Sequence, residues 1–352
     1  MARTGFRTVP PPGHTATAAS LGPPTPTVRR FDAFTPLHLV TLEQLAGDEP
    51  GSELIMMPEE YEDRDDVDED AEWRKGDHAP NCWVTTLIYQ HIDHHPNLVR
   101  FLRPDPWTWL PVFANPGGPH LSAFLGANRA EMYEQRSGGS TDNKTTACAR
   151  VRRTRLNLVY QWALHLAKAL EHIHSYAFDM TPVPKITIIF GDLDLEKCFL
   201  SPSGTTLSLL GFVNSGYRTR SSALHLGNFL YGYGFRPLPR DVTLQTDLFL
   251  WGSVVYELMT GHYPGNGQGL EYKDKSTMVP RREWPSLEAM YLGDVVRKCW
   301  AGDITSAAEL VVAVRKAVTD LGVVLGEDDV IEDLSLALEG LNLRPDPIQM
   351  QN

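Results

Sequence analysis

The segment ITIIFGDLDLEKCFLSPSGTTLSLLGF, residues 186–212, contains two short apolar runs separated by polar and turn-forming residues. The runs Ile186–Phe190 and Leu207–Leu210 predict two short buried strands, because turn-forming residues lie beside each of them. A loop that starts at Gly191 follows the first strand, and Ser201–Gly204 supplies a turn before the second. The segment therefore predicts a strand, a polar loop, a turn and another strand.

Helices are predicted on both sides of this segment. From Leu156 to His174 apolar residues recur at spacings of three and four, which is typical of a helix packed on one side. Asp247–Thr260 is apolar nearly all round, as expected for a helix in the centre of a domain. Nearer the N-terminus, Leu37–Leu45 and Leu54–Met57 predict strands of a small sheet. The expected fold class is α+β, with helices dominating the second half.

Composition limits the classes of protein that this chain can form. Its 352 residues exceed what a single small domain needs, so two lobes or two packed domains are expected. The net charge is −12, and the acidic run 59–72 contributes −9 of it, which predicts a solvated insertion there. The rest of the chain is nearly neutral, which argues against a protein that coats nucleic acid or an anionic membrane.

The ends of the chain and its cysteines suggest an intracellular protein. Residues 1–31 lack acidic side chains and hold six prolines, which predicts a disordered tail. A mitochondrial leader is the alternative, but the prolines would break the helix that it needs. No apolar run of eighteen residues occurs, and the four cysteines form no C-x-x-C pair. We expect a cytoplasmic or nuclear protein.

Five motifs in order resemble the protein kinase superfamily, in a divergent, fungal-type form. They are HHPNLVRFL (94–102), LVYQWALHLAKALEHIHS (158–175), the segment 188–212 with its Gly191-Asp192 loop, TDLFLWGSVVYELMTGHYP (246–264) and VVRKCWAGDITSAAEL (295–310). The resemblance covers about residues 35–320 and implies a bilobal protein-kinase-like fold. It implies a small degenerate β-rich N-lobe (32–115), a large mainly helical C-lobe (116–325) and a C-terminal extension (326–352).

The resemblance also assigns roles in the large lobe. Asp192 matches the catalytic-loop Asp that orients the acceptor hydroxyl, whereas Lys197 stands where the family has its metal-binding Asn. Gly211 replaces the Asp of the magnesium motif, and the packing residue Phe212 remains. Asp247 matches the central-helix Asp that in this family ties down the catalytic loop backbone.

The nucleotide-binding positions of the small lobe are degenerate as well. The strand expected to carry the phosphate-binding Lys reads Leu54-Ile55-Met56-Met57, and its partner Glu falls on Thr86. The resemblance therefore implies a pseudokinase that acts through protein–protein interaction and holds no cofactor. An active protein kinase that uses ATP and magnesium, with Asp194 or Glu196 as substitute metal ligands, is the alternative. A small-molecule phosphotransferase of the same fold is another.

A cluster of arginines and a cluster of histidines are further candidates for binding sites. Arg150, Arg152, Arg153 and Arg155 follow a linker-like stretch and could recognise a phosphate or carboxylate on a partner, or the acidic insertion, although a solvated helix start fits too. The histidines at 91, 94 and 95 fit a helix end and turn better than a metal site. We expect no metal, no nucleic acid and no membrane as partner, and the sequence identifies no protein partner.

Overall fold

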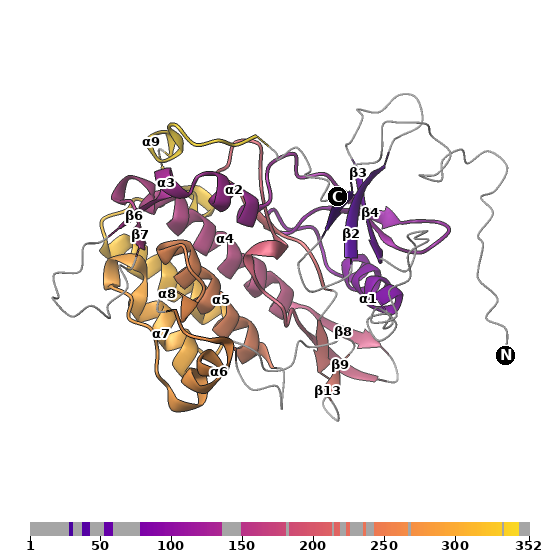
Figure 1. Ribbon diagram of the computed structural model, residues 1–352. Helices are drawn as coiled ribbons and strands as arrows, with labels where there is room; N and C mark the ends of the chain where they lie inside the picture. The colour runs from indigo at the N-terminus through magenta and orange to yellow at the C-terminus, as the bar shows by residue number, and fades with distance from the viewer. Residues whose placement is uncertain are drawn as a thin grey trace. The chain divides into compact units, whose positions relative to one another are not determined.

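The computed structural model places the described residues in two compact units. Those residues are 28–30, 37–42, 53–58, 78–135, 149–180, 183–212, 215–218, 223–225, 235–236, 243–266, 269–332 and 334–344. Unit 1 contains the described residues up to Gln90 together with Arg100–Asn115. Unit 2 contains His91–Val99 and the described residues from Pro116 onward. Figure 1 labels the elements of both units.

Unit 1 is an antiparallel sheet of five strands with one helix beside it (Figure 1). Its elements are β1 (Val28–Arg30), β2 (Leu37–Leu42), β3 (Glu53–Pro58), α1 (His78–His91), β4 (Phe101–Pro104) and β5 (Pro111–Ala114). The strand order is β1-β2-β3-β5-β4. Tyr89 of α1 joins helix and sheet, because its ring lies 5.0 Å from that of Phe113 and 5.7 Å from that of Phe101, between centroids.

The structure of unit 1 agrees with some of the sequence predictions and differs from others. The two predicted strands are present as β2 and β3, although β2 ends at Leu42. The prediction that residues 1–31 form a disordered tail is wrong at its end, because β1 pairs with β2 and Val28 lies opposite Val40. Residues 1–27 and the acidic run 59–72 lie outside the described residues.

Unit 2 is mainly helical, and its strands are short. Its longer elements are α2 (Leu121–Ala127), α4 (Leu156–Ser175), β9 (Val183–Ile189), α5 (Leu244–Thr260), α6 (Tyr272–Arg281), α7 (Gly293–Ala301) and α8 (Ala307–Asp320). Its shorter ones are α3 (Arg129–Met132), β6 (Tyr133–Gln135), β7 (Ala149–Val151), β8 (Ala177–Met180), β10 (Cys198–Leu200), β11 (Leu207–Leu209), β12 (Gly216–Arg218), β13 (Ala223–His225) and α9 (Ser335–Leu338).

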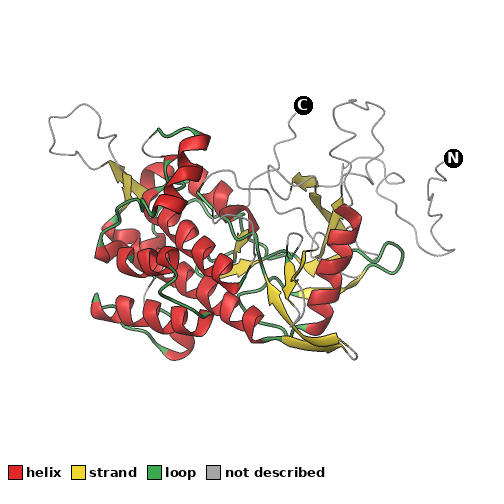
Figure 2. Ribbon diagram, turned by 90° about the horizontal axis from the view of Figure 1, so that it is seen from below, coloured by secondary structure: helices red, strands yellow, loops and turns green. Residues whose placement is uncertain are grey.

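Helices α4 and α5 form the core of unit 2, and both follow the predicted apolar patterns. Thirteen of the twenty residues of α4 are buried, and α5 is buried nearly all round. The indole of Trp251 donates to the carbonyl of Ala163 at 3.1 Å, which fixes the two helices to each other. Figure 2 shows the helices in red, with most of them gathered together. Thr243 caps α5, and Gly261 ends it at φ 70°, a conformation that favours glycine.

Three small antiparallel sheets lie at the edges of unit 2. The predicted strands around 186–190 and 207–210 are present as β9 and β11. Strand β11 pairs with β10, while β9 lies in a sheet of order β13-β12-β9-β8. Strands β6 and β7 form the third pair. In that pair Tyr133 lies opposite Val151, so the two strands bracket the linker-like stretch that precedes the arginine cluster.

The chain beyond α8 remains attached to unit 2. The carbonyl oxygen of the Gln161 side chain accepts a hydrogen bond from the backbone N–H of Ile331 at 2.6 Å. Farther on, the amide of Asn128 donates to the backbone carbonyl of Asn342 at 3.0 Å. The short helix α9 lies in this region, and residues 345–352 lie outside the described residues. The described C-terminal residues are thus held by side chains of α4 and of the segment after α2.

The α+β class predicted from the sequence is confirmed by these elements. Within the described ranges, no helix combines the length and the apolar character that crossing a bilayer requires. The described cysteines, Cys82, Cys198 and Cys299, are buried.

Candidate functional site

The loop Phe190–Lys197 is held to the core of unit 2 by one buried carboxylate. Asp247, on the first turn of α5, is fully buried. Its two oxygens accept the backbone N–H groups of Phe190 at 2.8 Å and Gly191 at 2.6 Å. The same carboxylate contacts Nε2 of His174, near the end of α4, at 2.8 Å. One side chain therefore joins α4, α5 and the start of the loop.

Gly191 turns the chain so that the next side chain enters the site. Its φ of 80° lies in the left-handed region, which favours glycine over other residues. Asp192 follows with 4% exposure. Asp194 then ends the turn, because its Oδ1 accepts the N–H of Lys197 at 3.1 Å and caps the short helix Leu195–Lys197. Asp192 and Asp194 are thereby oriented by backbone geometry on either side of Leu193.

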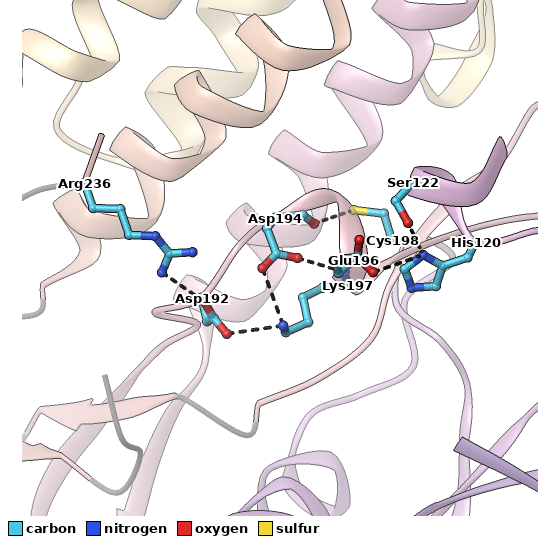
Figure 3. Close-up of polar contacts among 8 residues, drawn as sticks. All are labelled: His120, Ser122, Asp192, Asp194, Glu196, Lys197, Cys198 and Arg236. Atoms are coloured by element: carbon cyan, nitrogen blue, oxygen red, sulfur yellow. Dashed lines mark hydrogen bonds and ion pairs between the residues drawn. The ribbon is translucent and has the colours of Figure 1, made fainter. Parts of the chain in front are cut away.

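Lys197 lies between these two carboxylates (Figure 3). Its ammonium is 3.3 Å from Oδ2 of Asp192 and 3.5 Å from Oδ2 of Asp194, and the side chain is only 2% exposed. A buried ammonium is stable only beside opposite charge, so the lysine depends on both partners. The ammonium occupies the space between the carboxylates.

A second cation reaches Asp192 from a distant part of the chain (Figure 3). Arg236 Nη1 lies 3.1 Å from Oδ1 of Asp192. Burial lowers the pKa of Arg236, but Asp192, Tyr263 and Asp194 together outweigh it and raise that pKa above its ordinary value. The neighbouring Phe235 anchors the arginine, because its ring is buried 4.9 Å from that of Trp300 and its carbonyl accepts the Tyr263 hydroxyl. Both oxygens of Asp192 thus face cations.

A second acidic group lies on the other side of the loop. Glu196 approaches Nδ1 of His120 at 3.9 Å, and the same nitrogen is 2.9 Å from the hydroxyl of Ser122. Glu257 of α5 interacts electrostatically with Asp194 and Glu196 of the loop. Burial, with added repulsion from Asp194 and Glu196, raises the pKa of Glu257 to about 8. Glu257 is therefore protonated at neutral pH, because its carboxylate would be buried near the negative charges of Asp194 and Glu196.

The positions compared with the magnesium motif are occupied by a backbone turn and a packed ring. Gly211 has a φ of 131°, which a residue with a Cβ rarely adopts. Phe212 is 1% exposed, and its ring meets that of Phe190 edge-on at 5.4 Å. Phe212 therefore packs against the residue that precedes Gly191.

The two positions that the resemblance compares with nucleotide-binding residues lie inside unit 1. Met56 is fully buried in β3, opposite Leu39 of β2. Thr86 is buried in α1, and its hydroxyl donates to the carbonyls of Cys82 at 3.2 Å and Trp109 at 2.9 Å. These two positions therefore hold the thioether of Met56 and the hydroxyl of Thr86, which cannot form an ion pair with each other.

Three members of the arginine cluster have partners within unit 2. Arg150 is buried and lies 2.8 Å from Glu288. Arg152 donates to the carbonyl of Ala130, and Arg155 donates to those of Leu336 at 3.2 Å and Glu339 at 2.8 Å. Arg153 is exposed. The proposed anion-binding role of the cluster stays a prediction. The contacts show that three of its guanidinium groups bind other parts of unit 2.

The sequence singled out Asp192, Asp194, Glu196 and Lys197, and the structure brings them together in one loop. It missed Arg236 and His120, which arrive from segments with no local signal for this site. Over the described ranges, no three histidine, cysteine or acidic side chains gather as metal ligands. No protein-family model and no curated protein matches the chain.

Proposed function

We propose that the chain is a kinase-like domain of bilobal fold that has lost phosphoryl transfer and acts through protein–protein interaction. The loop Phe190–Lys197 supports the resemblance, because Asp247 holds its backbone as the resemblance expects of the central-helix aspartate. The helix order and the strands on either side of the loop agree with the motif order along the sequence. The loss of activity is argued from the loop itself.

The observation that carries the proposal is the position of the Lys197 ammonium. In the resembling family, the residue at this place binds magnesium, which phosphoryl transfer requires. Here an ammonium lies within 3.5 Å of both Asp192 and Asp194. A divalent cation at the same place would have to displace it and leave a buried ammonium beside a metal of like charge. The lysine therefore supplies the positive charge and excludes the metal.

Arg236 and Gly211 support the same conclusion. Arg236 takes the second oxygen of Asp192, so a substrate hydroxyl would compete with a charged hydrogen bond of 3.1 Å. Gly211 lacks the carboxylate of the magnesium motif, and its φ of 131° would strain an aspartate placed there. Both requirements of the reaction, a metal and an accessible carboxylate, are unmet.

Thermal unfolding with ATP, with ATP plus magnesium, and with neither tests this proposal. A ligand that binds only the native state raises the midpoint, so magnesium should add nothing to any shift that ATP produces. Asp192→Asn is the comparison at the site, and Asp294→Asn, at an exposed position of α7, is its matched control. A magnesium-dependent rise that Asp192→Asn abolishes and Asp294→Asn preserves would establish the active-kinase alternative instead.

A further inference from the structure

The segment His91–Val99 belongs to unit 2, although the chain on both sides of it belongs to unit 1. Asp93 attaches the start of this segment to the end of α4. Its backbone N–H donates to the hydroxyl of Tyr176 at 2.9 Å, and that hydroxyl donates to the Asp93 carboxylate. The carbonyl of Asp93 accepts a hydrogen bond from Nε2 of His172 at 2.9 Å. Side chains of α4 and of the residue after it therefore hold the segment here.

Two stacked imidazole rings add to this attachment. The ring centroids of His95 and His172 lie 4.6 Å apart, with 26° between the ring planes. Nδ1 of His95 accepts the backbone N–H of Asn97 at 3.2 Å, so this nitrogen carries no proton in the bonded state. His172 uses Nε2 as a donor, because a carbonyl can only accept. We name the two rings, together with Asp93 and Tyr176, the histidine clasp.

A second attachment joins the end of the segment to β11. The N–H of Val99 donates to the carbonyl of Leu209 at 3.0 Å, and the N–H of Leu209 donates to the carbonyl of Asn97 at 2.9 Å. The side-chain amide of Asn97 donates to the carbonyl of Leu207 at 3.1 Å. Backbone amides and carboxamides do not titrate near neutral pH, whereas imidazoles do. The segment thus has one attachment built on histidines and one built on groups that do not titrate.

The surroundings of His95 oppose a positive charge on its ring. Burial, with His172 and Lys168 of α4 and His94 of the segment itself, lowers the pKa of His95 to about 4. The hydrogen bond to Asn97 acts in the same direction, because a proton on Nδ1 would turn this acceptor into a donor that faces another donor. The closed clasp therefore requires a neutral ring.

Two carboxylates belong to the same surroundings, and each already has a partner. The Asp93 carboxylate accepts the tyrosine hydroxyl of the clasp, and that of Asp329 lies 3.2 Å from the Lys168 ammonium. Asp329 raises the pKa of His165 on α4, but burial, Lys168 and His95 outweigh it and lower that pKa to about 4. His165 is therefore also neutral when the clasp is closed.

We propose that the histidine clasp is an acid-sensitive fastening, which holds the start of the segment on α4 at neutral pH and releases it when His95 takes up a proton. The proton on Nδ1 removes the acceptor of the Asn97 N–H and sets a charged ring against His172. The attachment to β11 stays closed. Residues 92–96, between the end of α1 and that attachment, then become mobile. The inference does not depend on the function proposed above.

The direction of the pH effect follows from the two states of the clasp. In the open state the pKa of His95 returns to its ordinary value of 6.5, whereas in the closed state it is about 4. As pH falls below 6.5, the open state binds a proton that the closed state refuses, so the closed state loses stability. Between pH 7 and pH 5 we expect a loss of about tenfold in the closing equilibrium, because solvent screening of the half-exposed ring reduces the full effect.

Hydrogen exchange of the full chain, measured residue by residue by NMR at pH 7 and pH 5, tests the proposal. Protection factors are compared, because they divide out the intrinsic pH dependence of exchange. Those of the Asp93 and Asn97 amides should fall about tenfold at pH 5, since these amides donate to groups of the clasp. That of Val99 should stay constant, since its acceptor is the carbonyl of Leu209.

Three variants identify the group that responds to pH. His95→Asn keeps an acceptor near the position of Nδ1 but does not titrate, so protection at Asn97 should no longer depend on pH. His94→Asn, at the exposed neighbouring position, is the matched control and should retain the loss. His172→Gln keeps a donor for the Asp93 carbonyl and removes the second ring, so the loss should become smaller than in the wild type.

Three results would overturn the proposal. Equal protection of Asn97 at both pH values in the wild type means that the clasp does not open. A loss that Val99 shares means that acid unfolds the surrounding structure rather than the clasp. A loss that persists in His95→Asn assigns the effect to another group. Should His95→Asn fail to fold, a loss in His172→Gln equal to that of the wild type excludes the ring stack as the sensor.

Discussion

Lys197 is the residue on which the charge balance of the loop depends. Its ammonium lies beside both Asp192 and Asp194, while Arg236 forms an ion pair with Asp192. Removing one member of a buried ion pair costs more than the pair contributes, because the remaining charge stays buried without compensation. Asp192, whose side chain is 5% exposed, would lose one of the two cations that face it and keep Arg236.

Lys197→Met should therefore lower the free energy of unfolding by about 3–5 kcal/mol. Lys298→Met, at an exposed position of α7, is the matched control and should cost less than about 0.5 kcal/mol. Urea unfolding of both variants measures the difference. Asp192→Asn combined with Lys197→Met should cost less than the sum of the single changes, because the two groups interact directly. Equal losses in Lys197→Met and its control would contradict the assigned role.

Glu257 makes stability depend on pH in a defined window. Its pKa rises from 4.5 to about 8 in the native state, through burial and through Asp194 and Glu196, which outweigh the opposing effect of Arg129. Between these values the unfolded chain has released a proton that the native state keeps. Stability therefore falls as pH rises, by up to about 1.4 kcal/mol per pH unit, and levels off above pH 8.

Glu257→Gln should remove that fall. The difference in unfolding free energy between variant and wild type should grow from pH 4.5 to pH 8 and then stay constant. Urea unfolding at intervals of one pH unit measures it, with Glu283→Gln at an exposed position as the control. A difference that does not change with pH would show that Glu257 is already ionised at pH 7.

At the scale of elements, the side chain of Asp247 attaches the loop Phe190–Lys197 to α5. Asp247→Asn keeps the shape of the side chain but directs an amide N–H at one of the backbone donors of Phe190 and Gly191. We expect a loss of about 3 kcal/mol, because hydrogen bonds to a charged group are strong and an unsatisfied buried donor adds its own cost. Faster hydrogen exchange at Gly191 should accompany it. Normal exchange there, with stability equal to that of Asp294→Asn, would disprove the tether.

The segment around α9 depends on the arginine fork from Arg155. Its two terminal nitrogens donate to the carbonyls of Leu336 and Glu339, whereas the exposed Arg153 makes no such contact among the described residues. Arg155→Ala should accelerate hydrogen exchange across 334–344 by about tenfold, the equivalent of roughly 1.4 kcal/mol. Arg153→Ala is the neighbouring control and should leave exchange unchanged. Equal acceleration by both changes would assign the effect to helix charge instead.

Elements with a strong local pattern were predictable, and pairings between distant segments were not. Helices α4 and α5 follow from apolar spacing, and β9 and β11 follow from short apolar runs between turns. Strands β1, β6 and β7 contain no apolar run of this kind, and each forms through pairing with a partner strand. Arg236 belongs to the same class, because only the tertiary fold brings it to Asp192. The sequence singles out Lys197, but its ion pairs with Asp192 and Asp194 depend on the tertiary fold.

For unit 2 as a whole, Glu257 and two histidines have opposite effects on how the free energy of unfolding changes with pH. Burial, with nearby positive charge, lowers the pKa values of His95 and His165 to about 4. Below pH 6.5 the unfolded chain binds protons that these rings refuse, so stability falls with decreasing pH through this window. Solvent screening weakens the contribution of the partly exposed His95.

The two effects together predict maximal stability of unit 2 near pH 6.5. Below that value the histidines outweigh Glu257, and above it only Glu257 acts, up to pH 8. Urea unfolding from pH 4 to pH 9 measures the profile. Glu257→Gln should flatten its alkaline side and leave its acidic side falling. A profile that keeps rising through pH 8 would show that other groups control it.

The path of the chain between the units has a consequence for protein synthesis. Residues 91–99 belong to unit 2, and their partners include Leu207 and Leu209. The Asn97 side chain donates to the carbonyl of Leu207, the N–H of Val99 donates to the carbonyl of Leu209, and the N–H of Leu209 donates to the carbonyl of Asn97. Those partners are made about 110 residues later, which takes roughly 5–20 s on a ribosome. Leu98 and Val99, later buried, stay accessible to chaperones throughout that interval.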